Sequence, residues 1–559
     1  MEGEVALNIA RATVGLTQQN EQDRHSATRA MREYWALKKR EERARKRVIE
    51  VGIQENIETP RFQRRRICKH IETCWQEAIQ GISINEQREI FQELLLLPTF
   101  KDLRPIQSGA QRSILSNIQN TLMQVKVWQP GVDGLEDDEQ LQFDPSAYDC
   151  LHAFNLGWSC LSFDFLRDEL GLVRNEFPHT LFCVAGTQAG EAANNSVVVA
   201  RLANITGTRR KPAPTNADEE DDSDSSSSDE DDETGSVSNL KGPVLQARLI
   251  SHQGGVNRVR SMQQQAHIIA SWGDNGYVQV WDMSAHLRAL LTADPSLSTG
   301  LNNVLRQAPL QIFTGHKDEG YALDWSSVVS GRLLSGDCQS AIHLWEPTAE
   351  GKWVVDSKPF QGHTSSVEDL QWSPTEPDVF ASCSVDTTIG IWDARRRDGM
   401  VLSVKAHDLD VNVISWNRLA SCMLASGSDD GTFRIWDLRA FKEDSFVAHF
   451  KYHKKPITSI EWSSHETSTI GVTSADNQLT IWDLSLERDT EEETEFQAQM
   501  KQKVEAPENL PPQLLFVHQG QKDMKELHWH PQIPSLLMST AADGFNVLKP
   551  SNLESLQTS

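Results

Sequence analysis

Residues 362–395, "GHTSSVEDLQWSPTEPDVFASCSVDTTIGIWDAR", set a spacing that recurs along the chain. His363 lies 23 residues before Asp386, and Asp386 lies six residues before Trp392. Four further sets keep this spacing, and the last two replace the aspartate by an amide: His407, Asp430, Trp436; His453, Asp476, Trp482; His316, Gln339, Trp345; His252, Asn275, Trp281. Five copies of one spacing indicate an internal repeat, which decides the fold before any other feature.

Short β-rich runs alternate with turn residues between these markers, and "VFASCSVDTTIGIWD" is typical of strand, tight turn and strand. Units of about 40–45 residues with four strands resemble the WD-repeat blades of a β-propeller. The resemblance spans residues 150–550 and implies an all-β, seven-bladed propeller. Two blades are irregular, at Leu514–Leu548 and Gly157–Ile205. Because a ring must close, we expect the first strand of the chain to pair into the final blade.

Blades of this family contain a hydrogen-bonded relay of the histidine, a hydroxyl from the second strand, the turn aspartate and the tryptophan. The hydroxyl candidates here are Ser382 and Ser426. A buried histidine and aspartate must satisfy each other, so we interpret the repeated residues as structural. Where Gln339 or Asn275 replaces the aspartate, we expect the amide still to bond the histidine.

The formal net charge is −25, and it is unevenly placed. Residues 1–126 carry 21 Lys and Arg against 16 Asp and Glu, so the remaining residues carry −30. An acidic body argues against sequence-specific nucleic-acid binding by the propeller, which would need positive surface against phosphates. It favours basic protein partners.

Residues 216–233, "NADEEDDSDSSSSDEDDE", cannot bury enough surface to fold. We expect a disordered acidic loop at 210–240 between two blades, and a second one at 486–510. Eleven acidic residues of the first loop are predicted to shield a basic client: Asp218, Glu219, Glu220, Asp221, Asp222, Asp224, Asp229, Glu230, Asp231, Asp232 and Glu233. Three serines each precede an acidic residue by three positions and are candidate phosphorylation sites, although a Ser-rich filler explains them equally well: Ser226, Ser227 and Ser228.

A structured client site is a further hypothesis. Loops that follow the histidines, and the turns that carry the aspartates, share the narrower face of a propeller. Six acidic residues fall in or beside them: Asp318, Glu319, Glu368, Asp369, Asp408 and Asp410.

The first 125 residues differ from the rest and read as a basic helical extension of unknown role. Ser83 and Glu86 fit a capping box, and Pro98 ends that helix. Basic runs at 38–47 and 61–69 fit nuclear import, nucleic-acid contact or a solvated helix face. We expect a linker and helix at 126–156, the propeller at 157–549 and a tail at 550–559.

Catalytic motifs of the common enzyme families are missing from the sequence. "HWH" at 528–530 is a weak metal candidate that matches an ordinary blade position. Eight cysteines without a C-x-x-C pair indicate reduced thiols, and no apolar run suggests a signal peptide or membrane span. We therefore expect a non-enzymatic protein without catalytic residues, metal or cofactor.

The stretch at Phe143–Gly171, "FDPSAYDCLHAFNLGWSCLSFDFLRDELG", resembles the opening of the glutamate-rich WD-repeat proteins. "VAGTQA", "GGVNRVR", "ALDWS", "GRLLSGDCQSAIHLW" and "LLFVHQGQKDMKELHWHPQ" fit that family in order, over residues 126–549. The resemblance implies a nuclear, largely nucleolar protein of large ribosomal subunit assembly, similar to a chaperone of ribosomal protein L-three. The family is related to histone-binding WD-repeat chaperones, so core histones are an alternative client.

A second alternative is a substrate adaptor of a cullin-based ubiquitin ligase. Arg395 and Arg439 complete W-D-x-R motifs in consecutive blades, which resemble the docking box of such adaptors. Ordinary blade ends carry the same motif, so the sequence leaves both interpretations open.

Overall fold

The computed structural model describes residues 65–67, 140–142, 147–207, 242–294, 303–486 and 511–553. The predicted helices of residues 1–125, both acidic segments and the three candidate phosphorylation serines lie outside these ranges. β1 (Arg65–Ile67) and β2 (Gln140–Gln142) form a two-stranded antiparallel sheet. The three residues of β1 are therefore strand, although we predicted a helical region there.

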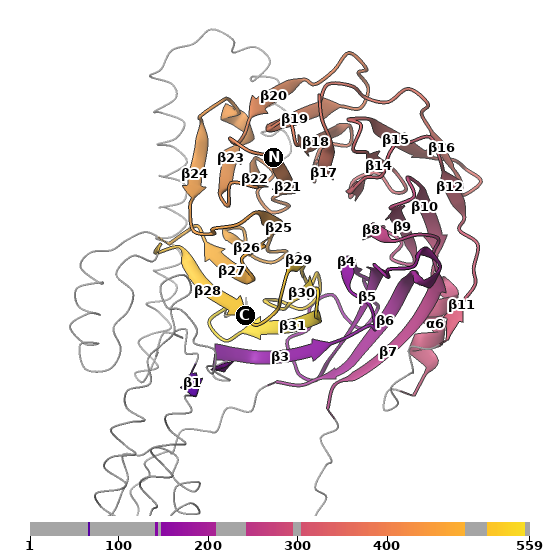
Figure 1. The fold of residues 1–559 in the computed structure, drawn as a ribbon, viewed down its shortest axis with the longest axis vertical. Helices are drawn as coiled ribbons and strands as arrows, with labels where there is room; N and C mark the ends of the chain where they lie inside the picture. The colour runs from indigo at the N-terminus through magenta and orange to yellow at the C-terminus, as the bar shows by residue number, and fades with distance from the viewer. Residues whose placement is uncertain are drawn as a thin grey trace, which may run out of the picture. The chain divides into compact units, whose positions relative to one another are not determined.

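Seven further sheets form the blades of a propeller among the described residues (Figure 1). The first three blades, in strand order from the centre outward, are β4 (Cys160–Phe165), β5 (His179–Thr187), β6 (Ser196–Ile205) and β7 (Val244–Ser251); β8 (Val256–Ser261), β9 (Ile268–Gly273), β10 (Val278–Asp282) and β12 (Gln311–Phe313); β13 (Ala322–Trp325), β14 (Leu333–Gly336), β15 (Ile342–Pro347) and β16 (Trp353–Val355).

The next three blades contain the complete copies of the repeat. They are β17 (Val367–Trp372), β18 (Val379–Ser384), β19 (Thr388–Asp393) and β20 (Leu402–Lys405); β21 (Val411–Trp416), β22 (Met423–Ser428), β23 (Phe433–Asp437) and β24 (Phe446–Phe450); β25 (Ile457–Trp462), β26 (Thr469–Ser474), β27 (Gln478–Asp483) and β28 (Leu514–Gln519).

The seventh blade closes the ring with strands from both ends of the propeller sequence. β29 (Met524–Trp529), β30 (Leu537–Ala541) and β31 (Gly544–Pro550) are joined by β3 (Tyr148–Phe154), which lies outermost beside β31 (Figure 1). This pairing confirms the expected closure. Residues 148–154 are thus a propeller strand rather than the predicted linker and helix, because a closed ring needs a fourth strand for its last sheet.

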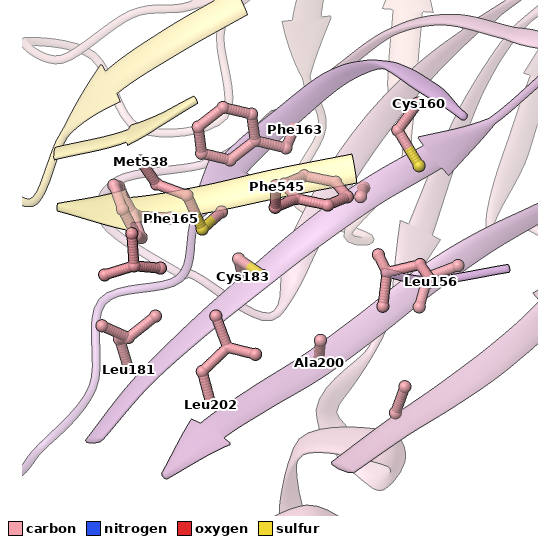
Figure 2. Close-up of a cluster of buried hydrophobic side chains, with 14 of the residues drawn as sticks. Leu156, Cys160, Phe163, Phe165, Leu181, Cys183, Ala200, Leu202, Met538 and Phe545 are labelled. Carbon is pink, nitrogen blue, oxygen red and sulfur yellow. The ribbon is translucent and has the colours of Figure 1, made fainter. Parts of the chain in front are cut away.

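A hydrophobic cluster fills the junction between the first and the last blade (Figure 2). Phe163 of β4 packs edge-on against Phe545 of β31, with ring centroids 5.8 Å apart. Met538, Leu181 and Leu202 are buried beside them. Since neighbouring sheets cover both faces of each blade, strands such as "SVVVARLANI" are apolar along nearly their whole length.

The relay expected of the repeat is present in the β17–β20 blade. His363 Nδ1 donates to Asp386 Oδ2 at 2.9 Å. The Ser382 hydroxyl lies 2.6 Å from His363 Nε2 and accepts from Trp392 Nε1 at 2.7 Å. In the next blade, His407 lies 2.8 Å from the Ser426 hydroxyl, as predicted.

The β25–β28 blade builds the same relay with a hydroxyl from a different strand. His453 Nδ1 donates to Asp476 Oδ2 at 3.0 Å. Its Nε2 lies 2.9 Å from the hydroxyl of Thr480, which accepts from Trp482 Nε1 at 2.8 Å. Thr480 belongs to the third strand, β27, so the hydroxyl in this blade does not come from the second strand.

The expectation that Gln339 and Asn275 bond the histidines was wrong. His316 Nδ1 donates to Asp337 Oδ2 at 2.9 Å, because Asp337 reaches the relay from two residues earlier in the turn. Gln339 instead donates to Asp318 at 3.1 Å. Asn275 donates to the carbonyl of Gln253 at 2.7 Å and caps its own turn.

The 208–241 acidic segment lies within a blade, not between two blades as predicted. β6 and β7, the strands at its two ends, pair antiparallel in one sheet from Ser196–Ser251 to Ala203–Val244. The segment therefore connects the third and fourth strands of the first blade. The 487–510 segment likewise connects the third and fourth strands, β27 and β28, of the sixth blade.

An insertion in the second blade supplies α6 (Ser284–Thr292) and β11 (Val304–Leu305), and β11 pairs parallel with β7. Within the described ranges, no helix is long and apolar enough to cross a membrane. The six cysteines in those ranges are free thiols.

Candidate client-binding surfaces

The strand connections divide the propeller into two faces. In an up-and-down blade, the first–second and third–fourth connections lie at one end, and the second–third turns and blade-to-blade connections lie at the other. We name the end with His363, His407 and His453 the histidine face. We name the end with the connections at 166–178, 206–243 and 484–513 the loop face.

The predicted carboxylate site belongs to the histidine face. Asp318 and Asp408 are exposed, and Glu319 is half-buried and accepts a hydrogen bond from Asn257 Nδ2 at 2.9 Å. Burial, followed by repulsion from Asp429, raises the pKa of Asp410. Burial also raises the pKa of Glu368. Carboxylates that are hard to ionise would be relieved by a cation at this face.

Asp369 is not part of that exposed site. Its side chain is buried, and Oδ2 accepts the backbone N–H of Ile414 on the next inner strand at 3.1 Å. Burial raises the pKa of Asp369. Alternation along β17 turns Asp369 toward the adjoining blade and Glu368 toward a more accessible environment, so two neighbours in the sequence differ in accessibility.

Polar side chains of the inner strands tie each blade to the next. Asp324 accepts the Trp372 N–H at 2.7 Å, and Glu461 accepts the Trp529 N–H at 2.8 Å. Glu526 of β29 accepts the Phe163 N–H of β4 at 2.8 Å and so continues these ties across the ring closure. The charges near the centre of the ring therefore have a structural role.

A buried ionic cluster surrounds Glu526. Arg258 and Arg260 of β8 each donate to Glu526 Oε1 at 2.7 Å. His528 Nδ1 lies 3.2 Å from Glu461, and its Nε2 lies 3.5 Å from Glu526. Burial alone would lower the pKa of His528, but the charges of Glu461 and Glu526 outweigh it and raise that pKa to about 10.

Sequence reasoning missed this cluster, although alternation in "NRVR" and "ELHWH" places its side chains on single strand faces. The weak metal candidate divides between two environments. His528 faces carboxylates, whereas His530 Nδ1 accepts the Gln532 N–H at 3.0 Å and its ring packs on Phe165. Among the residues that the structure describes, no group of three or more His, Cys, Asp or Glu could hold a metal ion.

The two W-D-x-R motifs have one geometry. Arg395 binds the carboxylate of Asp393 through Nε and Nη2 at 2.9 and 2.6 Å, and Arg439 binds Asp437 at 2.9 and 2.7 Å. The Arg395 side chain is 70% exposed and that of Arg439 is 34% exposed. Each arginine is thus held by its own blade with its guanidinium at the surface.

Comparison with known proteins places this geometry in a family. The WD domain, G-beta repeat family matches residues 355–393, 399–437 and 444–483, which contain the three repeats with an aspartate at the expected position. The family of the histone-binding protein RBBP4 and the CAF1 complex matches residues 138–206. The glutamate-rich WD repeat-containing protein 1 of Dictyostelium discoideum is 50% identical over 77% of this chain and 86% of its own. The chain belongs to the glutamate-rich WD-repeat protein family.

Two further relatives cover the same share of the chain. Protein HEAT STRESS TOLERANT DWD 1 of Arabidopsis thaliana is 62% identical over 77% of this chain and 92% of its own. Ribosome assembly protein rrb1 of Schizosaccharomyces pombe is 42% identical over 77% of this chain and 86% of its own. Among solved structures, the WD40 propeller of Doa1 matches 72% of the chain at a TM-score of 0.43 and 12% identity, too remote to carry an argument.

Proposed function

We propose that this member of the glutamate-rich WD-repeat family acts in large ribosomal subunit assembly. In this role it is a non-enzymatic chaperone of a basic ribosomal protein, L-three, in the nucleus and nucleolus. The observation that carries the proposal is the common origin of both acidic segments. Each connects the third and fourth strands of a blade, so both begin and end on the loop face. A relative named for ribosome assembly supports the biological setting.

The acidic segments give the loop face an excess of negative charge. Residues 208–241 contain eleven Asp and Glu against four Lys and Arg, and residues 487–510 contain eight against three. Each exposed ion pair with a client contributes only about 0–1 kcal/mol. Together, many such pairs steer a basic protein into rapid, salt-sensitive capture. Ribosomal RNA, a denser polyanion, would then displace the chaperone.

The test is affinity purification of the tagged chain from nuclear extract at low and high salt, with mass spectrometry of the stoichiometric partner. We expect L-three at low salt and its loss at high salt. A variant in which Asn216–Glu233 is replaced by a neutral Ser/Asn sequence of equal length should bind purified L-three more weakly and with a smaller salt dependence. Unchanged affinity and salt dependence would refute the role of this segment.

A histone chaperone is the second candidate, and the histone-binding family match over residues 138–206 favours it. The same electrostatic capture would then act on core histones rather than a ribosomal protein. Histones as the dominant stoichiometric partner, with L-three absent, would move the function to chromatin.

Ligase adaptor use rests on the shared geometry of Arg395 and Arg439 at the surface. The double variant Arg395→Ala and Arg439→Ala should abolish co-purification of a cullin-ligase adaptor if these arginines form a docking box. If L-three binding persists in the same variant, the two activities are separate.

A further inference from the structure

An apolar loop projects from the first blade between β4 and β5. We name residues 166–178 the apolar loop. Leu172 is 89% exposed, Val173 is 59% exposed and Leu170 is 52% exposed. Single exposed apolar side chains are common on protein surfaces, but three within four residues of one loop form a local apolar cluster.

A side chain from the last blade holds this loop in place. Buried Gln532 donates through Nε2 to the carbonyls of Asp168 and Gly171, both at 2.8 Å. Its Oε1 accepts the Asp168 N–H at 3.0 Å, and its backbone carbonyl accepts the Arg174 N–H at 2.9 Å. The exposed leucines therefore project from an ordered backbone, so a partner would bind them at a low cost in backbone entropy.

Contacts within the loop support the same conformation. Arg174 forms an ion pair with Asp168 at 2.9 Å and donates to the Thr180 carbonyl at 2.9 Å. Gly171 has a φ of +143°, a conformation that other residues rarely adopt. The loop is thus built to keep Leu172 and Val173 in water rather than to bury them.

The apolar loop lies beside the root of the first acidic segment. It is a first–second connection and so belongs to the loop face, in the same blade as the 206–243 connection. A Cβ atom at Gly207 would lie only 3.0 Å from the Phe177 ring, which places the end of the apolar loop against the start of the acidic segment. Exposed Glu169 and Glu176 add negative charge within the loop.

We propose that the apolar loop is a docking surface for leucine-like side chains within the Lys/Arg-rich client segment that the acidic segments attract. This inference rests on the proposed function and adds a source of specificity to it. Charge alone would bind any polycation, whereas an ordered apolar contact beside the charge selects basic segments that also carry apolar residues. The acidic surroundings favour a basic occupant over a second copy of this acidic chain.

The test uses the full chain and two fluorescent 20-residue peptides with the same ten lysines, one carrying four leucines and the other serines at those positions. The loop variant is Leu172→Ser with Val173→Ser. The matched control, Leu409→Ser with Val447→Ser, changes residues that are 50% and 52% exposed elsewhere. Kd is measured by fluorescence anisotropy at one fixed salt concentration.

We expect the wild type to bind the leucine peptide roughly tenfold more tightly than the serine peptide, the effect of burying about one leucine side chain. The loop variant should lose that preference, and the control should keep it. Equal loss for both peptides, or no loss, overturns the docking surface while leaving electrostatic capture intact. A wild type that binds neither peptide nor L-three overturns the proposed function itself. Sedimentation of a wild-type dimer that the loop variant converts to a monomer would also overturn the proposal, because the occupant would be a second copy.

Discussion

The β17–β20 blade and the ring closure both hold charged groups inside the propeller, but over very different lengths of chain. His363 finds Asp386 23 residues away. Glu526 finds Arg258 across 268 residues and the Phe163 N–H across 363. The first arrangement is repeated from blade to blade, and the second occurs once, where the two ends of the ring sequence meet. The blade relays thus stabilise each unit, whereas the closure cluster stabilises the ring.

The largest expected effect is loss of the closure carboxylate. Glu526→Ala should lower the free energy of unfolding by about 3–5 kcal/mol, because it leaves Arg258 and Arg260 buried without their partner. Urea denaturation followed by tryptophan fluorescence measures the change. Asp408→Ala, at an exposed carboxylate, is the matched control and should change little. Equal stability of the two variants would show that the cluster does not hold the ring.

The pH dependence separates the two regions. The pKa of His528 is raised to about 10 in the folded protein, against about 6.5 for an ordinary histidine. Its contribution is therefore complete below about pH 6.5 and is lost as the pH rises through about 10. Unfolding free energy should fall by about 2–3 kcal/mol between pH 7 and pH 9, at up to about 1.4 kcal/mol per pH unit. His528→Gln should flatten this decline, and an unchanged alkaline slope would contradict the assignment.

The relays should respond at the opposite end of the pH scale. Burial by itself would raise the pKa of Asp386, but hydrogen bonds from His363 and Thr388 outweigh burial and lower it well below the usual range. The stability that Asp386 contributes is present above the unfolded pKa of about 3.9 and is lost as the pH falls further. Acid therefore weakens the blades and alkali weakens the closure.

A smaller effect is expected inside one relay. Ser382→Ala removes the hydroxyl shared by His363 and Trp392 and should lower stability by about 1–3 kcal/mol, the cost of leaving buried polar groups unpaired. The control is Ser403→Ala on the exposed outer strand β20, and chemical denaturation at pH 7 compares the two. If Ser382→Ala matches its control, the hydroxyl is dispensable.

These two regions also show what the sequence could predict. The relay is local, so its His–Asp–Trp spacing is visible in one repeat and Ser382 and Ser426 were found correctly. Closure by the first strand could be expected because a ring leaves no free edge. The partners of Glu526 come from distant strands, and no spacing within "ELHWH" indicates Arg258. Placement of the acidic segment failed for a related reason: the strand that follows it, β7, carries none of the repeated markers and was assigned to the wrong blade.

The smallest expected effect concerns a position where the repeat itself is misleading. Gln339→Asp would restore the usual residue, and comparison of repeats alone would predict stabilisation. The structure predicts a loss of about 0.5 kcal/mol, within the usual range for surface substitutions. Asp337 already accepts the His316 proton, and a new carboxylate at 339 would face Asp318, which now accepts from the Gln339 amide. Thermal unfolding of Gln339→Asp beside Gln339→Ala measures the difference. An increase in Tm for Gln339→Asp alone would mean that the aspartate at 339 displaces Asp337 from the relay.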